Sequence, residues 1–401
     1  MEFTGDDTIA RRVQTFAARL AEGKANDYYF YNQPVHELRG GSRVLVDGRE
    51  MSMYASYSYL GLIGHPRINA AAQAAVEKYG TGTHGVRLLA GTLSLHEELE
   101  ATIADFKHAE AALTYTSGYA TNLSVISTLI GRGDYVLSDK LNHASIVDGC
   151  LTSGAEFRRF KHNDMADLER VLAGIPKDKG KLVIVDGLYS MGGDLAPLPE
   201  IATLCKKHAA RLMVDDAHGM GVMGAGRGTA AHFGVTPDVD LIMSTFSKSF
   251  ASLGGFIAGD DQVIHYIKHH ARALIFSASI PAANAAAALA ALKIMRDEPQ
   301  RVERLTAIAD RVRRELRSMG FNIGPSVSPI IPILIGDFSK TILAWKTLFE
   351  AGVFVNPILS PAVPQGMEML RTSYMATHTD AQIDRVLAIY GEVGKQLGLI
   401  A

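Results

Sequence analysis

Two apolar segments of the chain end in side chains whose chemistry is complementary. Residues 212–214 (LMV) run directly into Asp215, and residues 241–243 (LIM) lead through a short polar stretch to Lys248. A lysine amine forms an imine with an aldehyde, and a carboxylate keeps a pyridine nitrogen protonated so that the ring accepts electrons. Asp215 and Lys248 are therefore the two groups needed to hold and use an aldehyde cofactor that contains a pyridine ring.

Each of these residues also has an ordinary structural interpretation. Alone, Lys248 would be a solvated surface lysine and Asp215 a helix cap. The pair together, with small residues around the lysine and His218 three positions after the aspartate, favours the cofactor hypothesis. The small hydroxyl residues beside the lysine, Thr245 and Ser247, are suited to holding a phosphate.

A second phosphate-binding segment follows residues 111–115, which are predicted to form a strand. Ser117, Gly118 and Tyr119 lie between this strand and an expected helix. Backbone N–H groups at a helix N-terminus bind phosphate, and glycine permits close approach. A plain helix cap explains Ser117 equally well, and both interpretations can hold together.

His143 follows the predicted strand 135–138 in the segment NHAS (142–145). A neutral imidazole at this place is able to stack on a flat cofactor ring. A lone histidine is more often structural, so the hypothesis for His143 depends on the other segments.

Strands and helices alternate over residues 59–281, which predicts a mostly parallel sheet covered by helices. Ligands of such sheets bind beyond the carboxyl ends of the strands, where the polar residues above are found. We expect an N-terminal helix and arm (1–55), a large cofactor-binding domain (56–285) and a smaller C-terminal α+β domain (286–401). In the first two thirds of the chain the clearest elements are a helix over 7–23, strands over 111–115, 135–138, 182–186, 212–215, 241–244 and 255–258, and helices over 94–106 and 198–208. A long helical region runs from 281 to about 319, followed by a strand over 330–335, a helix over 339–351, short segments over 353–356 and 368–372, and a final helix over 380–397.

Composition excludes several classes of protein. The 401 residues carry a formal net charge of −2, which disfavours nucleic acid as a partner. Cys150 and Cys205 fit neither a disulfide framework nor a zinc site, and we expect no metal. The start MEFTGDDTIA lacks the features of a signal peptide, and we find no integral membrane segment, so the cytoplasm is the expected location. The glycine-rich stretch from Gly221 to Gly228 does not follow a strand and is not a dinucleotide-binding motif.

Five segments in order give the chain a specific resemblance. SGYATN (117–122), LNHASI (141–146), VDDAHGMGVMGAGRG (214–228), TFSKSFASLGGFIAG (245–259) and FSASIP (276–281) are similar to segments of the α-oxoamine synthase family. The resemblance covers about residues 59–374. It implies the fold-type-I architecture of pyridoxal-phosphate-dependent transferases. It also implies the condensation of an amino acid with an acyl thioester, acyl-CoA or acyl carrier protein, with loss of CO2.

The resemblance also implies roles for individual residues. Lys248 would bind the cofactor aldehyde and act as the base, Asp215 would pair with the pyridine nitrogen, and His143 would stack on the ring. His218 and Ser190 would lie near the phenolic oxygen. The phosphate would be held by Ser117, Gly118, Tyr119, Thr245 and Ser247 and, across a homodimer with shared active sites, by Ser277 and Ala278 of the neighbouring subunit. Arg371 would hold the substrate carboxylate, a task that suits a guanidinium fork.

The identity of the substrates is a finer question. The segments TFSKS (245–249) and KHHARALIFSAS (268–279) resemble bacterial serine palmitoyltransferases, which favours serine and a long-chain acyl thioester. Ser58 stands where the family usually has Asn or Asp, so it bears on the choice of amino acid. An 8-amino-7-oxononanoate synthase-like or secondary-metabolite enzyme using alanine or glycine stays open. A fold-type-I aminotransferase is an alternative of another class. A catalytically inactive subunit is a further alternative, but it would be expected to lack Lys248.

Overall fold

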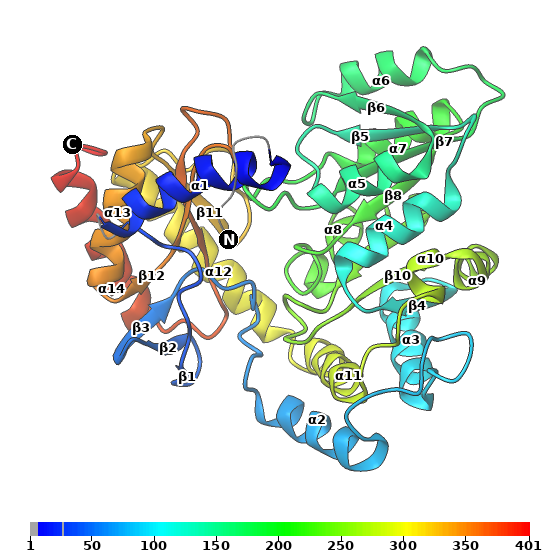
Figure 1. Ribbon diagram of the computed structural model, residues 1–401, viewed down its shortest axis with the longest axis horizontal. Coiled ribbons are helices and arrows are strands. Elements are labelled where there is room, and N and C mark those ends of the chain that lie inside the picture. The colour runs from blue at the N-terminus through cyan, green and yellow to red at the C-terminus, as the bar shows by residue number, and fades with distance from the viewer. Residues whose placement is uncertain (1–6, 26–27) are drawn as a thin grey trace.

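The structure is a computed structural model that describes residues 7–25 and 28–401. Figure 1 shows two lobes, of which one is built around a large sheet and the other combines the N-terminal and C-terminal parts of the chain. The first helix, α1 (Thr8–Ala25), agrees with the prediction over 7–23. Residues 1–6, where we expect no signal peptide, lie outside the described residues.

A seven-stranded sheet forms the centre of the larger lobe, in the order β4-β10-β9-β8-β7-β5-β6. Strand β10 runs antiparallel to both neighbours, and the other pairs are parallel. Every residue of β7 and β9 is buried, as expected for a sheet covered on both faces. The strands are β4 (Ala111–Tyr115), β5 (Tyr135–Asp139), β6 (Glu156–Phe160), β7 (Lys181–Asp186), β8 (Arg211–Asp215), β9 (Leu241–Thr245) and β10 (Gly255–Gly259).

Six of these strands lie within about one residue of the sequence prediction, and β6 was not among the predicted strands. Its sequence EFRRF is mostly polar, and only Phe160 is buried. As the edge strand of the sheet, β6 carries no apolar run by which the sequence would reveal it.

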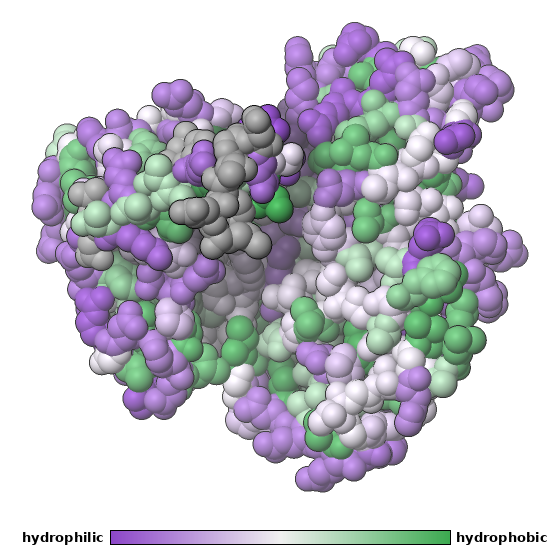
Figure 2. Space-filling model, in the orientation of Figure 1, coloured by the Kyte–Doolittle hydropathy of each residue, from purple (hydrophilic) through white to green (hydrophobic). Residues whose placement is uncertain are grey.

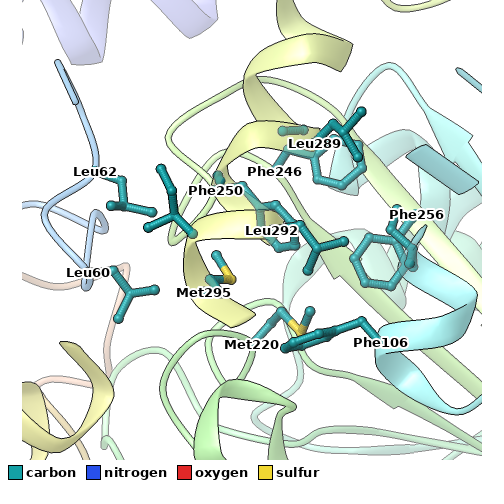
Figure 3. Packing of buried hydrophobic residues seen from close by; sticks show 14 of the residues in the cluster. Leu60, Leu62, Phe106, Met220, Phe246, Phe250, Phe256, Leu289, Leu292 and Met295 are labelled. Carbon is teal, nitrogen blue, oxygen red and sulfur yellow. The ribbon is translucent and has the colours of Figure 1, made fainter. Parts of the chain in front are cut away.

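Helices cover both faces of the sheet (Figure 1). Small side chains allow the alanine-rich helix α11 (Ala282–Asp297) to pack closely against α2 and α3. Figure 3 shows the adjoining core, where Leu289 and Leu292 of α11 meet Phe246, Phe250 and Phe256. The helices of this lobe are α2 (Pro66–Tyr79), α3 (Ser94–Lys107), α4 (Gly118–Leu129), α5 (Ala144–Ser153), α6 (Met165–Ala173), α7 (Leu198–Lys207), α8 (Thr229–His232), α9 (Asp261–His270), α10 (Arg272–Ile275) and α11, with 3-10 turns η1 (Gly224–Gly226) and η2 (Thr236–Asp238).

The helical region predicted from 281 to about 319 is divided into two helices. Helix α11 ends at Asp297, and Pro299 caps the start of α12 (Gln300–Ser318). Proline lacks the N–H that a continuous helix requires, so the chain changes direction here. The division of the chain at residues 55 and 285 remains a prediction.

The smaller lobe contains two short sheets. One has the order β11-β14-β13, and the other joins the N-terminal arm to the C-terminal part of the chain in the order β1-β2-β3-β12. The predicted segment 353–356 covers β12 and the start of β13, which belong to different sheets. The elements are β1 (Glu37–Leu38), β2 (Arg43–Val46), β3 (Arg49–Met53), β11 (Ile330–Leu334), β12 (Val353–Phe354), β13 (Asn356–Ile358), β14 (Met369–Ser373), α12, α13 (Phe338–Glu350) and α14 (Asp380–Gln396).

The outer surface is largely hydrophilic, and it is hollowed between the two lobes (Figure 2). Among the residues that the structure describes, no helix is both long and apolar enough to cross a membrane.

Candidate active site

A cavity of about 250 Å³ lies at the carboxyl ends of the central strands. It brings together nine residues that the sequence analysis selected from distant parts of the chain. These are Ser117, Gly118, Tyr119, His143, Asp215, His218, Thr245, Ser247 and Lys248. The parallel order of β7, β8 and β9 explains the convergence, because their carboxyl ends meet at one edge of the sheet.

Asp215 ends strand β8 and is only 5% exposed. Its Oδ2 accepts a hydrogen bond of 2.7 Å from Nδ2 of Asn122, and its Oδ1 accepts one of 3.0 Å from the backbone N–H of Ala217. Both contacts hold the carboxylate in place facing the cavity, where it can pair with a protonated ring nitrogen.

Lys248 lies three residues beyond the end of β9, and its amine is surrounded by protein. Burial lowers its pKa to about 8, although the charges of Asp215 and Asp186 act in the opposite direction and Arg371 lowers it further. A lysine with such a pKa has a larger neutral fraction near pH 7 than an exposed lysine, so it is a better nucleophile and base.

The N-terminus of α4 forms one wall of the cavity. Ser117 is its N-cap, and its Oγ accepts a 3.0 Å hydrogen bond from the N–H of Ala120. A Cβ atom on Gly118 would come within 2.9 Å of the Cβ of Thr245, so a larger residue would obstruct this wall. Thr245 Oγ1 and Ser247 Oγ lie 2.8 Å apart opposite the helix. Helix N–H groups and clustered hydroxyls provide the donors that a phosphate needs.

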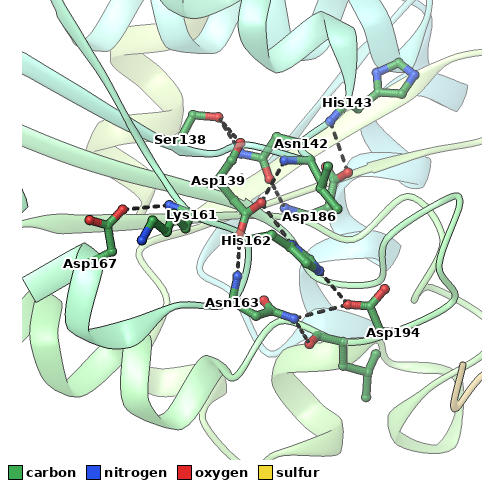
Figure 4. A network of polar contacts seen from close by, with 12 residues as sticks. Ser138, Asp139, Asn142, His143, Lys161, His162, Asn163, Asp167, Asp186 and Asp194 are labelled. Atoms are coloured by element: carbon green, nitrogen blue, oxygen red, sulfur yellow. Dashed lines mark hydrogen bonds and ion pairs between the residues drawn. The ribbon is translucent and has the colours of Figure 1, made fainter. Parts of the chain in front are cut away.

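His143 is the N-cap of α5 (Figure 4). Its backbone N–H donates to Oδ2 of Asp186 over 3.1 Å, and its Nδ1 lies 2.8 Å from Oγ of Ser145. Burial lowers the pKa of His143. The charge of Asp215 acts to raise this pKa, and the charge of Lys248 lowers it further. A neutral imidazole is thus held at the cavity wall.

His218 is buried, with Nδ1 2.6 Å from the hydroxyl of Tyr59. Burial lowers its pKa well below the usual value, and the charges of Lys248 and Arg371 add to this effect. Burial also raises the pKa of Tyr59 to about 12. Both groups are therefore neutral, and the pair exchanges a hydrogen bond without a net charge.

Arg371, on β14 of the smaller lobe, is 1% exposed. Its Nε donates a 2.7 Å hydrogen bond to the carbonyl oxygen of Ser190. Neither Nη1 nor Nη2 has a hydrogen-bond partner among the described residues. Its guanidinium lies 4.8 Å from the centre of the Tyr57 ring, and the Lys248 amine is 5.9 Å from the same ring centre. Two unpaired donors beside the lysine form a ready site for a carboxylate.

Four further predicted residues lie outside this cavity, as Arg371 does. Ser190 contacts Arg371 through its carbonyl group, and Ser58 uses its Oγ to accept a 3.2 Å hydrogen bond from the N–H of Leu62. Ser277 is half-buried, and Ala278 is exposed and pairs with Val86 in an isolated bridge. The roles of these residues stay predictions.

The sequence analysis missed Asn122, Asp186, Tyr57 and Tyr59 as individual site residues. Asp186 had a usable signal, because it ends strand β7 as Asp215 ends β8. Burial raises its pKa well above the usual value, the charge of Asp215 adds to this, and its Oδ1 has no partner among the described residues. The two tyrosines carried no comparable signal, since they lie in a loop before α2.

The sequence profile described as Aminotransferase class I and II matches residues 53–389. The chain belongs to this family. The chain is similar to a serine palmitoyltransferase of Sphingobacterium spiritivorum, with 46% identity over 97% of each protein. It is also similar to an 8-amino-7-oxononanoate synthase of Thermoanaerobacter pseudethanolicus, with 42% identity over 91% of this chain and 93% of the relative. Both are α-oxoamine synthases, so the predicted branch of the family is confirmed.

Solved structures give the same result. The serine palmitoyltransferase of Sphingomonas wittichii has a TM-score of 0.96 and 35% identity, and the match covers 98% of this chain and all (100%) of that one. A serine palmitoyltransferase solved with PLP has a TM-score of 0.95 at the same 35% identity, covering 98% of this chain and 100% of that one. The predicted fold-type-I architecture and the predicted pyridoxal phosphate cofactor are therefore confirmed for this aminotransferase-family chain.

The residues present fit this cofactor. Asp215 and Lys248 line the same cavity, and the N-terminus of α4 lies there beside the hydroxyls of Thr245 and Ser247, which suits a phosphate. Within the described part of the chain, no group of three or more His, Cys, Asp or Glu side chains is arranged to hold a metal ion.

Proposed function

We propose that this enzyme condenses a small L-amino acid with an acyl thioester and releases CO2 and the free thiol, leaving an α-amino ketone. The observation that carries the proposal is the pair of unpaired Nη atoms on buried Arg371, beside the Lys248 amine across the Tyr57 ring. This arrangement suits a substrate whose carboxylate is held while its Cα faces a base. The close relatives, named as serine palmitoyltransferases and 8-amino-7-oxononanoate synthases, support it.

Pyridoxal phosphate supplies the electron sink that makes the Cα proton of an amino acid acidic. Lys248 removes that proton, and its pKa of about 8 suits a base that works near neutral pH. Asp215 would keep the pyridine nitrogen protonated, and Asn122 holds Asp215 in place. Arg371 would hold the carboxylate until it leaves as CO2, and the protonated Lys248 amine would then return a proton to the carbon that has lost it.

His143 faces the reacting atoms from the opposite wall of the cavity. As a neutral imidazole it donates a hydrogen bond to the thioester oxygen, on which negative charge develops when the new carbon–carbon bond forms. The carbonyl is then restored as the thiolate leaves, which takes up a proton to become the free thiol.

A second cavity of about 750 Å³ adjoins the first and shares Ser247 with it. Val35, Leu38, Met53, Ile63 and Phe354 give it an apolar lining, and Ser58 lies on its wall. This space supports a long-chain acyl group. Together with the relatives, it favours serine and a long-chain acyl-CoA, hence a sphingolipid-type product, over alanine or glycine. The proposal includes a homodimer in which Ser277 and Ala278 of one subunit reach the cofactor phosphate of the other. A cytoplasmic location stays a prediction.

The test supplies purified enzyme with 1-14C-labelled serine, alanine or glycine, each with a long-chain acyl-CoA and without it. We expect labelled CO2 and free CoA in equal amounts, only when both substrates are present, and fastest with serine. Release of a keto acid without thioester would indicate an aminotransferase instead. Thioester-dependent turnover with alanine, and none with serine or glycine, would favour the 8-amino-7-oxononanoate synthase alternative.

A further inference from the structure

Arg371 is oriented by a loop of the other lobe. This loop, residues 188–195, follows β7 and is closed by a 2.9 Å hydrogen bond from the N–H of Tyr189 to the carbonyl of Asp194. Its Ser190 carbonyl is the acceptor for Nε of Arg371. Because the guanidinium group is planar, fixing Nε also fixes the directions in which the two Nη atoms point.

His162 ties this loop to the central sheet (Figure 4). Its Nδ1 lies 3.0 Å from Oδ1 of Asp139 at the end of β5, and its Nε2 lies 2.8 Å from Oδ2 of Asp194 in the loop. The next residue strengthens the link, since the side chain of Asn163 donates to Asp194 over 3.1 Å and to the carbonyl of Leu195 over 3.0 Å.

The link carries charge. Burial acts to lower the pKa of His162, but hydrogen bonds and the charges of Asp139 and Asp194 outweigh burial and raise it to about 9. The imidazolium form has two N–H donors, one for each carboxylate. Asp139 and Asp194 are both buried, so each depends on this cation for compensation. Tyr189 packs edge-on against the ring, with centres 4.4 Å apart.

We propose that His162 is a positioning residue for the substrate carboxylate: by clamping Asp194 to Asp139 it holds the 188–195 loop, and the Ser190 carbonyl in turn sets the direction of the Arg371 guanidinium. The proposal rests on the role that the proposed function gives to Arg371. His162 itself is not among the residues that line the cofactor cavity.

The experiment compares wild-type holoenzyme with the H162Q and D194N variants. The dissociation constant of the amino acid is measured from the change it causes in the visible spectrum of the bound cofactor. Both variants are expected to weaken binding about tenfold, which corresponds to about 1.4 kcal/mol. The spectrum without amino acid and kcat at saturating substrate should change little. Because both variants break the same link, the double variant should bind the amino acid no more weakly than the weaker-binding single variant.

A second measurement does not need turnover or cofactor. Hydrogen exchange of cofactor-free protein should be faster in residues 188–195 of H162Q than in wild type. The exchange rates of the strands of the central sheet should not change. The control is H265Q, which replaces an exposed histidine on α9 and should match wild type in both assays. If H162Q does not fold, D194N carries the same comparison.

Two results would overturn the proposal. One is a folded variant whose dissociation constant for the amino acid lies within twofold of wild type. The other is a variant in which kcat falls as much as the affinity for the amino acid and the cofactor spectrum changes, which would indicate general damage to the site. An Arg371→Lys variant separates this failure from that of the proposed function. If R371K binds the amino acid as wild type does, the role of Arg371 itself is wrong.

Discussion

Nδ2 of Asn122, in the first turns of α4, donates a 2.7 Å hydrogen bond to Oδ2 of Asp215 at the end of β8. The same Nδ2 lies 2.9 Å from Oγ of Ser145 on α5. One buried amide therefore connects the helix that would hold the phosphate, the carboxylate that would hold the ring nitrogen, and the helix that His143 caps.

Replacing this amide should weaken cofactor binding. We expect Asn122→Ala to raise the dissociation constant of pyridoxal phosphate about tenfold or more, because a hydrogen bond to a charged group contributes about 1.5–3 kcal/mol. Titration of cofactor-free protein, followed by visible absorption, measures this. Thr128→Ala on the same helix is the control. Unchanged affinity in N122A would show that Asp215 needs no support from Asn122.

The pKa of Lys248 predicts how cofactor capture depends on pH. Because only the neutral amine attacks the aldehyde, and burial lowers the pKa of Lys248 to about 8, the capture rate should rise with pH and level off above about 8. An exposed lysine would show a midpoint near 10.4, as ordinary lysines do. Stopped-flow mixing of cofactor-free protein with pyridoxal phosphate gives the rates, and a small-molecule amine corrects for titration of the cofactor. Lys248→Ala should show no such phase.

The buried ion pair between Arg87 and Glu100 predicts a large loss of stability. Nη1 of Arg87 lies 2.6 Å from Oε1 of Glu100, and the two side chains are 3% and 11% exposed. Glu100→Gln leaves a buried guanidinium without its counter-charge, which should cost about 3 kcal/mol of unfolding free energy. Denaturant unfolding measures this.

The matched control lies on the same helix. Glu98 pairs with Lys293 at 2.9 Å, but their side chains are 54% and 41% exposed. Glu98→Gln should therefore change the unfolding free energy by less than about 1 kcal/mol. Equal effects of the two substitutions would show that burial does not govern the Arg87 pair.

His378 makes stability depend on pH. It is 1% exposed and stacks on Tyr54, and its Nδ1 accepts a 2.9 Å hydrogen bond from the N–H of Met375. Burial lowers its pKa to about 4, although hydrogen bonds to Met53 and Met375 act in the opposite direction. The folded histidine stays neutral while the unfolded one gains a proton near pH 6.5. The contribution of neutral His378 to the unfolding free energy is therefore complete above pH 6.5 and is lost as the pH falls to about 4.

That loss amounts to about 3 kcal/mol over this interval. The unfolding free energy of His378→Gln should accordingly fall less steeply between pH 6.5 and 4.5 than that of wild type. Denaturant unfolding at several pH values compares the two slopes. Parallel curves would mean that folding does not lower the pKa of His378.

The large sheet was predictable because apolar strands that are buried on both faces are visible as short apolar runs. Asp215 and Lys248 could be selected for the same reason, since Asp215 directly follows such a run and Lys248 comes a few residues after one. Strand β6 was missed because an edge strand needs no apolar run. Helix α12 was merged with α11 because the helical pattern resumes directly after Pro299, at Gln300.

The sequence by itself determined the order of the elements, the family resemblance and the types of residue at the strand ends, because these depend on neighbours along the chain. Tertiary structure alone decided that Asn122 supports Asp215, that Tyr59 faces His218, and that Arg371 reaches the site from the other lobe through Ser190. Such contacts join residues far apart in the chain. They arise from the packing of one element on another, for which no local pattern exists.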